Sequence, residues 1–254
     1  MDMNKLKDVA YKKNKDMPRY AVLITHNISI HLVRLLSRTP ITPNQVTLLS
    51  VLMGILSGLS FSQYSPLRYL LGAILLEFYY VLDASDGQLA RIKNQSSLTG
   101  AYFDYISNHI IHSLVFLSIG YGLFCYTSSI LYLISGISAA WGILFMYGVH
   151  DARYSVLYNS GKSLSEGGNQ DIPIRQMAKP SFAKKAFIFM HCLCRYPTIM
   201  NLITVFSLIN LIFLLLGIAD GSGLFGGLIT FYAVAINIVW ISKLSTVILK
   251  KELD

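Results

Sequence analysis

Residues 82–109 read LDASDGQLARIKNQSSLTGAYFDYISNH and lie between two long apolar segments. Three aspartates, Asp83, Asp86 and Asp104, stand in this stretch, inside or next to segments that otherwise resemble membrane helices. Ionisable side chains at such a depth are costly to a membrane protein and are usually functional. The stretch therefore predicts two membrane helices joined by a short polar turn, with a functional site where the helices meet.

The composition of the whole chain is that of an integral membrane protein. Its 254 residues are 54% hydrophobic and 13% charged, with a mean hydropathy of +0.52. A soluble domain carries roughly 25% charged residues. The formal net charge of +8 suits an anionic membrane surface, and the sequence shows no basic patch interleaved with aromatic residues. We therefore expect membrane lipids as partners and no nucleic acid.

Six segments are long and apolar enough to cross a bilayer, which takes roughly 20 residues. The expected spans are residues 43–62, 68–90, 98–124, 127–150, 197–218 and 223–248. If the N-terminus is cytoplasmic, the external loops contain only Arg68, and the other twenty of the 21 lysines and arginines lie inside or at inner helix ends. Cytoplasmic loops carry such an excess, so we expect both termini in the cytoplasm.

The segments outside these spans complete the predicted fold. Residues 20–40 repeat apolar side chains at helical spacing with basic residues among them, which is typical of a helix lying in the membrane interface. Residues 151–185 predict a polar cytoplasmic loop, and residues 182–197 a second interfacial helix. The expected fold is an all-α integral membrane protein with six transmembrane helices and an N-terminal interfacial amphipathic helix. We divide it into a cytoplasmic N-terminus with that helix, residues 1–40, and a membrane domain, residues 41–254.

The first half of the motif places its chemistry on one helix face. At 100° per residue, Asp83, Asp86, Gly87 and Ala90 share that face, and Arg91 lies at its edge. The two small residues remove bulk, so a ligand can approach the backbone. The arginine is a fixed cation suited to phosphate. These residues predict a site for a phosphorylated ligand.

The second half of the motif adds Gly100, Asp104 and Asn108, each one turn after the last. A short connection makes the two helices antiparallel neighbours, so their carboxylates can converge. Carboxylates in an apolar surround repel one another unless a cation neutralises them. Ligand sets made only of oxygen favour Mg²⁺, Mn²⁺ or Ca²⁺ over zinc. Together the residues indicate a metal-bound nucleotide diphosphate and phosphoryl transfer.

Residues 83–108 read DASDGQLARIKNQSSLTGAYFDYISN, which resembles the signature of the CDP-alcohol phosphatidyltransferases, D-x2-D-G-x2-A-R-x8-G-x3-D-x3-D. Seven of the eight fixed positions match at the family's spacing, and the eighth holds Asn108. The six-span plan and the TPNQVT entry to the first span also resemble the family. The resemblance therefore extends from the motif over most of the chain.

The resemblance implies a reaction and its cofactors. Members of the family transfer a substituted phosphoryl group from a CDP-linked alcohol, often CDP-diacylglycerol, to an acceptor and release CMP, in lipid or surface-glycan synthesis. It implies Mg²⁺ or Mn²⁺, two ions being expected, held by Asp83, Asp86 and Asp104 with Asn108 at the fourth ligand position. It also implies a homodimer and an active site at the cytoplasmic face.

The resemblance further assigns the nucleotide site. Besides Asp83 and Asp86, it implies that Gly87 and Ala90 make room for the cytidine nucleotide. It implies that Arg91 holds a phosphate or a neighbouring carboxylate. Gly100 would keep the second helix close.

Asn108 stands where the family's last aspartate also deprotonates the acceptor, and an amide cannot act as a general base. Three explanations stay open. The chain is an inactivated variant, or its acceptor is already anionic, as a phosphate or phosphonate is, or another side chain is the base. His112, one turn further, and the adjacent His109 are candidates for such a base. Arg153, after the fourth span, is a candidate to bind an acceptor phosphate.

Two non-enzymatic alternatives remain. The chain could bind CDP-alcohols with little or no turnover, because Asn108 replaces the family's last aspartate. It could also be a small transporter that uses the aspartates as a cation site, although the sequence shows neither inverted repeats nor broken helices. The identity of the acceptor and of the CDP-linked alcohol stays open.

Overall fold

The computed structural model describes residues 19–160, 182–218 and 220–249, and within these ranges the chain is helical and contains no strand. The helices are α2 (Arg19–Leu36), α3 (Pro43–Phe61), α4 (Pro66–Ile92), α5 (Leu98–Thr127), α6 (Ile130–Asn159), α7 (Phe182–Leu193), α8 (Tyr196–Leu216) and α9 (Ser222–Leu249). The all-α prediction is confirmed. Each predicted span coincides with one long helix, namely α3, α4, α5, α6, α8 or α9.

Within the described ranges, five helices are long and apolar enough to cross a membrane: α3, α5, α6, α8 and α9. They support an integral, multi-pass membrane protein. Helix α4 has 27 residues but is not one of the five, and it carries Glu77, Asp83, Asp86 and Arg91. The sixth span therefore stays a prediction, whose physical basis is that α4 packs along α3.

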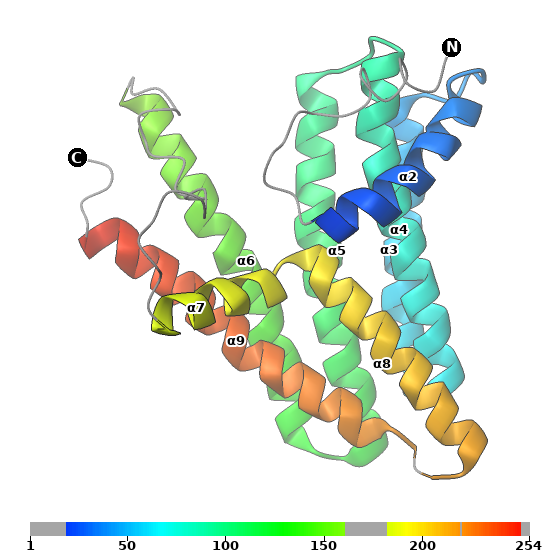
Figure 1. Cartoon of the computed structure of the whole chain (residues 1–254), viewed down its shortest axis with the longest axis vertical. Coiled ribbons are helices and arrows are strands. Elements are labelled where there is room, and N and C mark those ends of the chain that lie inside the picture. Colours follow the sequence, from blue (N-terminus) through cyan, green and yellow to red (C-terminus); the bar gives the residue numbers. More distant parts are fainter. Residues whose placement is uncertain (1–18, 161–181, 219, 250–254) are drawn as a thin grey trace.

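Figure 1 shows α3, α4 and α5 standing close to parallel, while α6 and α9 cross each other beside them. The α4–α5 connection and the last turn of α6 lie at one end of the molecule, at the top of the view. The α5–α6 and α8–α9 connections lie at the opposite end. The motif is therefore built at one end of the bundle.

The helices that carry the motif and its support begin with local capping signals. Thr42 forms a capping box with Gln45, whose backbone N–H donates to the threonine hydroxyl and whose side chain accepts from the Thr42 N–H at 2.9 Å. Pro43 occupies the first turn of α3, where its missing N–H costs nothing. Ser97 caps α5, its hydroxyl accepting from Gly100 N at 3.0 Å. These caps set where α3 and α5 begin.

Helix α3 lies against both helices of the motif. Backbone contacts are extensive between α3 and α4 and between α3 and α5, whereas α4 and α5 make few backbone contacts with each other. The two helices nevertheless meet through side chains, as expected of neighbours: the Tyr69 hydroxyl of α4 donates to the Ile119 carbonyl of α5 at 3.3 Å, and Asn108 of α5 contacts Asp83 of α4. The backbones of α4 and α5 are further apart than those of α3 and α4, and the polar side chains of the motif extend between them. The pocket described below lies beside these side chains.

Gly54 explains how α3 approaches α5 so closely. A Cβ atom built on this glycine would lie 2.6 Å from Cγ2 of Ile111 in α5, a distance that real Cβ contacts do not show. One turn later, a Cβ on Gly58 would lie 2.9 Å from Leu114. This pair of small residues is thus used within the chain, where it lets two helix backbones pack closely.

Helix α2 covers the motif end of α4, and Figure 1 shows it running obliquely to the bundle. The amide Nε2 of Gln88 donates to Ser29 Oγ at 2.8 Å. Val33 packs in a small buried cluster with Val46 and Leu89. The predicted helix therefore forms, and its location in the membrane interface stays a prediction.

The polar stretch after the fourth predicted span begins as helix rather than loop. Helix α6 continues to Asn159, because residues 151–159 contain no proline or glycine to end it. The prediction of a loop that starts at residue 151 is therefore wrong. Residues 161–181 of that predicted loop lie outside the described residues. The helix predicted over residues 182–197 forms as α7, which ends at Leu193 and contacts α8 and α9, and its location in the membrane interface stays a prediction.

Candidate functional site

Asn108 joins the two halves of the motif. Its Nδ2 donates to Asp83 Oδ1 and to Asp104 Oδ1, both at 3.1 Å, and lies 3.1 Å from the Asp104 carbonyl. Its Oδ1 accepts from the hydroxyl of Tyr79. The structure thus brings one carboxylate from α4 and one from α5 onto the same amide group.

Asp86 is nearly buried, with 4% of its surface exposed, and is held from a third helix. Its Oδ2 accepts from Thr47 Oγ1 of α3 at 2.6 Å. Asp104 is a charged neighbour of both Asp83 and Asp86. The three motif aspartates therefore interact electrostatically. Asn108 donates to Asp83 and Asp104, whereas Thr47 donates to Asp86.

The chemistry of this cluster suits a hard divalent ion, because all its side-chain donors are oxygen atoms on carboxylates. In the described part of the chain, however, no three His, Cys, Asp or Glu side chains are placed as a ready metal site. Instead, the carboxylates accept hydrogen bonds from the Asn108 amide and the Thr47 hydroxyl. The residues fit Mg²⁺ or Mn²⁺ in kind, and side-chain rotation would be needed to gather them on one ion.

The remaining motif residues lie around this cluster. A Cβ on Gly87 would meet only Nη1 of Arg91, at an ordinary 3.6 Å, so the surface beside the glycine is open. The Arg91 guanidinium interacts electrostatically with Asp86. Ala90 is partly exposed on the same helix. Gly100 lies in the first turn of α5, where a Cβ would stand 3.1 Å from Asn44 Oδ1 at the start of α3.

A pocket of about 380 Å³ opens beside the motif and shares Asp83 and Asn108 with it. Its other walls come from α5, α6 and the start of α8. Aromatic residues of four helices line it: Tyr80, Tyr105, Tyr147 and Tyr196. A molecule in this pocket would therefore touch the motif on one side and aromatic rings on the others.

His112 presents an unused polar atom at this pocket. Its Nδ1 lies 2.6 Å from the hydroxyl of Tyr147, and its ring stacks on Tyr196 with the centroids 3.1 Å apart. Within the described residues, neither His112 Nε2 nor the Tyr196 hydroxyl has a hydrogen-bond partner, although both atoms are buried. Buried polar atoms are normally paired, so these two atoms of pocket-lining residues are exceptions, and a ligand would reach them only after side chains shift.

The motif and the helical plan agree with a comparison against protein-family models. The model described as CDP-alcohol phosphatidyltransferase matches residues 40–239, which is most of the chain. The chain belongs to this family. The predicted resemblance is therefore confirmed.

The chain is also similar to curated proteins over part of its length. It is 39% identical over 88 residues to cholinephosphotransferase 1 of Xenopus laevis, covering 32% of this chain and 21% of that protein. It is 38% identical over 70 residues to the bifunctional IPC transferase and DIPP synthase of Aquifex aeolicus, covering 28% of this chain and 15% of that protein. The corresponding protein of Thermococcus kodakarensis is 37% identical over 71 residues, with 28% and 16% covered. The chain thus spans only about a fifth or less of these relatives.

The two histidines named as candidate bases of this family member differ in their surroundings. His109 Nδ1 lies 2.7 Å from the Tyr105 carbonyl, and its Nε2 lies 3.7 Å from Asp151 Oδ2. The hydroxyl of Tyr105 donates to the same aspartate. Both ring nitrogens of His109 thus have partners, whereas Nε2 of His112 has none within the described residues. Of the two candidates, His112 is therefore the one with an unpaired ring nitrogen in the described part of the chain.

The candidate acceptor-binding arginine is not at the pocket. Arg153 lies on α6 beyond Asp151, and it is not one of the lining residues. Arg195, the residue before α8, lines the pocket instead. Sequence reasoning missed Arg195 and Tyr147, since each is distant from the motif in sequence and neither belongs to it. The only local signal is Pro197, which marks the start of α8.

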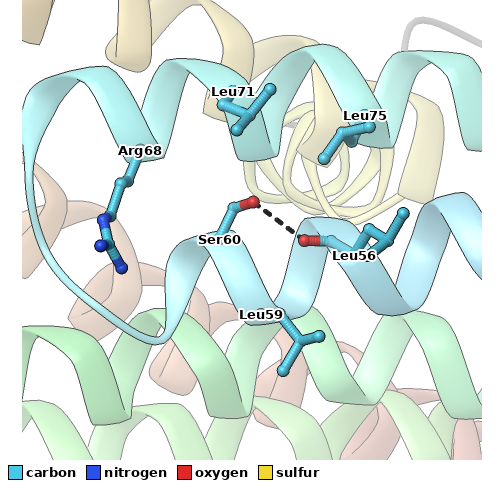
Figure 2. A pocket seen from close by; sticks show the side chains of 6 residues that line it. All are labelled: Leu56, Leu59, Ser60, Arg68, Leu71 and Leu75. Carbon is cyan, nitrogen blue, oxygen red and sulfur yellow. Dashed lines mark hydrogen bonds between the residues drawn. The ribbon is translucent and has the colours of Figure 1, made fainter.

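A second hollow, of about 520 Å³, lies between α3 and α4 away from the motif. Figure 2 shows its lining, four leucines with Ser60 and Arg68. The serine hydroxyl is used within its own helix, donating to the Leu56 carbonyl at 2.9 Å. This lining is mostly apolar and contains no carboxylate, so this family member has its candidate active site at the motif.

Proposed function

We propose that the chain is a metal-dependent phosphotransferase that moves a substituted phosphoryl group from a CDP-linked alcohol to a small polar acceptor and releases CMP. One observation carries the proposal: Asp83 and Asn108 belong to the motif and also line the pocket that contains His112. A donor held at the motif and an acceptor held in the pocket would therefore meet at these two residues.

The donor side follows from the motif residues. Asp83, Asp86 and Asp104 would hold Mg²⁺ or Mn²⁺, which neutralises charge on the diphosphate when it is bound. Arg91 would bind a phosphate oxygen, as a guanidinium does with two parallel hydrogen bonds. The open surface beside Gly87 would take the nucleotide.

The acceptor side follows from the pocket. A volume of about 380 Å³ is near the lower limit of ligand pockets, so it suits a small polar group rather than a pair of acyl chains. His112 Nε2 and the Tyr196 hydroxyl would hydrogen-bond an acceptor hydroxyl, and Arg195 would bind an acidic group on the same molecule. The relatives are named as a cholinephosphotransferase and IPC transferases, so they support phosphotransfer without naming one acceptor.

The proposed step balances in atoms and charge. The acceptor oxygen attacks the β-phosphorus of the CDP-alcohol while the bond from that phosphorus to CMP breaks. A hydroxyl acceptor gives its proton to His112 Nε2, whose ring Tyr147 orients. An acceptor that is already anionic needs no proton transfer. Arg91 stabilises negative charge that develops on the transferred group.

Orientation and assembly complete the proposal. The motif end of the bundle would face the cytoplasm, together with both termini, because the basic residues concentrate there. Members of the family commonly form homodimers, and we expect the same here. Helix α4 would be the sixth membrane span.

The test measures CMP release by purified protein in detergent with Mg²⁺ or Mn²⁺. Labelled CDP-diacylglycerol and a panel of CDP-polyols serve as donors, with inositol, glycerol phosphate, serine and a phosphonate as acceptors, and mass spectrometry identifies the product. An Asp104→Asn variant is the matched control and should release no CMP. Binding of a CDP-alcohol without CMP release would support the non-catalytic alternative that Asn108 suggests. If neither the unsubstituted chain nor Asn108→Asp turns over any donor, the proposal is wrong.

A further inference from the structure

Asn108 is held in one orientation by partners on both sides. Ionised carboxylates only accept hydrogen bonds, so the Nδ2 group must face Asp83 and Asp104. The opposite atom, Oδ1, then faces the hydroxyl of Tyr79, which donates to it. The reversed amide would put an oxygen against two carboxylates and a nitrogen against the tyrosine hydroxyl. The contacts therefore agree on a single arrangement.

This arrangement gives the amide a task that an aspartate cannot perform. The two N–H bonds of Nδ2 serve one carboxylate from each half of the motif, with both distances at 3.1 Å. A carboxylate at residue 108 would bring a third negative charge to the same place and would have no proton to donate. Like charges about 3 Å apart cannot all stay ionised without a cation or a proton between them.

We propose that Asn108 is a neutral bridge that takes the place of one metal ion, so that this chain binds a single divalent cation where the family signature implies two. The inference rests on the proposed function. Three motif carboxylates carry a charge of −3, which one divalent ion reduces to −1, and Arg91 lies beside Asp86 to offset the remainder. A fourth carboxylate would restore the need for a second ion.

The bridge also argues against Asn108 as a metal ligand. Its ligating atom, Oδ1, faces the hydroxyl of Tyr79 rather than the carboxylates. To turn Oδ1 toward an ion shared with Asp83 and Asp104, the amide would lose both carboxylate hydrogen bonds and the tyrosine bond together. The single ion is therefore held by the aspartates, and Asn108 positions two of them.

The experiment counts bound metal directly. The purified unsubstituted chain and Asn108→Asp are titrated with Mn²⁺, and free Mn²⁺ is followed by electron paramagnetic resonance. We expect one Mn²⁺ per chain for the unsubstituted protein and two for Asn108→Asp. Asn108→Ala, which removes the bridge without adding charge, is the control and should bind one ion more weakly.

Thermal unfolding supplies a second readout that needs no activity. In EDTA, Asn108→Asp should unfold at a lower temperature than the unsubstituted chain and should recover more of its stability when Mn²⁺ is added. Two ions, or none, on the unsubstituted chain would overturn the inference, whether or not Asn108→Asp folds. Absence of CMP release from a protein that binds one ion would instead contradict the proposed function and leave the metal count standing.

Discussion

The Nδ1 atom of His112 on α5 lies 2.6 Å from the hydroxyl of Tyr147 on α6. This contact joins two helices at the pocket and leaves the opposite ring atom, Nε2, without a partner among the described residues. A histidine whose one nitrogen is fixed by a neighbour presents the other in a defined direction. The pair therefore fixes the orientation of an imidazole that lines the pocket beside the motif.

Replacement of this histidine tests whether the acceptor is a hydroxyl. Because proton transfer typically contributes 10²–10⁴-fold, His112→Gln should lower kcat by about that factor and change the pH profile of the rate. His109→Gln is the matched control and should have a much smaller effect, since His109 contacts Tyr105 and Asp151. A rate that is unchanged in His112→Gln would indicate an acceptor that needs no deprotonation.

Tyr147→Phe tests how much the orientation of the His112 ring contributes, apart from the proton transfer proposed for that ring. The variant keeps the aromatic wall of the pocket but removes the hydroxyl that contacts His112. We expect kcat to fall less than in His112→Gln, with KM for the acceptor nearly unchanged. Steady-state kinetics on both variants check this. A rise in KM for the acceptor that exceeds the fall in kcat would mean that Tyr147 binds the acceptor itself.

Removal of the hydroxyl that holds Asp86 should destabilise the bundle. Thr47 Oγ1 donates to the buried Asp86 carboxylate at 2.6 Å, and a hydrogen bond to a charged group contributes about 1.5–3 kcal/mol. Thr47→Val should lower the free energy of unfolding by about that amount. Chemical denaturation in detergent measures it, and Thr47→Ser, which keeps the hydroxyl, is the control. Equal stabilities of Thr47→Val and Thr47→Ser would contradict the role of this contact.

The close approach of α3 and α5 can be tested with two alanine substitutions. Gly54→Ala places a Cβ 2.6 Å from Ile111 and should cost about 1–3 kcal/mol through overpacking. Gly148→Ala on α6 is the control, because nothing lies within 4 Å of a Cβ at that position. That control should be neutral or slightly stabilising, as alanine favours a helix over glycine. Thermal unfolding distinguishes the two, and a neutral Gly54→Ala would show that the helices are packed less tightly.

The end of the bundle opposite the motif should titrate in alkali. Burial raises the pKa of Tyr64 from 10.0 to about 12, and its hydroxyl contacts Asn210 and the Asp220 carbonyl. The folded state therefore favours the protonated phenol. Its contribution is fully present below pH 10, the ordinary value, and is lost as the pH rises through about 12. Unfolding measured from pH 8 to 12 should show this loss, and Tyr64→Phe should show less of it. An identical alkaline loss in the variant would exclude Tyr64 as its source.

The motif could be recognised from residue type and spacing, because its parts lie within 26 consecutive residues on two helices. The all-helical fold and the helix bounds also follow from local signals, such as the Thr42 cap and the long apolar runs. The end of α6 was placed too early, since polar residues after residue 150 do not by themselves stop a helix. Helix formation and helix ends depend on residues within a few turns of one another, so they can be predicted from a short stretch of sequence.

Other features depend on contacts between distant segments. Helix α3 packs against both α4 and α5, and these two meet through side chains, which the short connection between them does not reveal. Arg195 rather than Arg153 lines the pocket, because α8 enters the bundle beside α5. The amide of Asn108 meets Asp83 only once two helices are placed side by side.

Residue order thus specified the family, the helices and the kinds of atoms at the motif, since these follow from composition, period and spacing along the chain. Three-dimensional packing alone selected which histidine presents an unpaired nitrogen, which arginine meets the pocket, and which atom of Asn108 faces the carboxylates. The reason is physical, because a side chain's partners are set by the helices packed around it. Asn108 and Asp83 are 25 positions apart in the sequence, and His112 and Tyr147 are 35 positions apart.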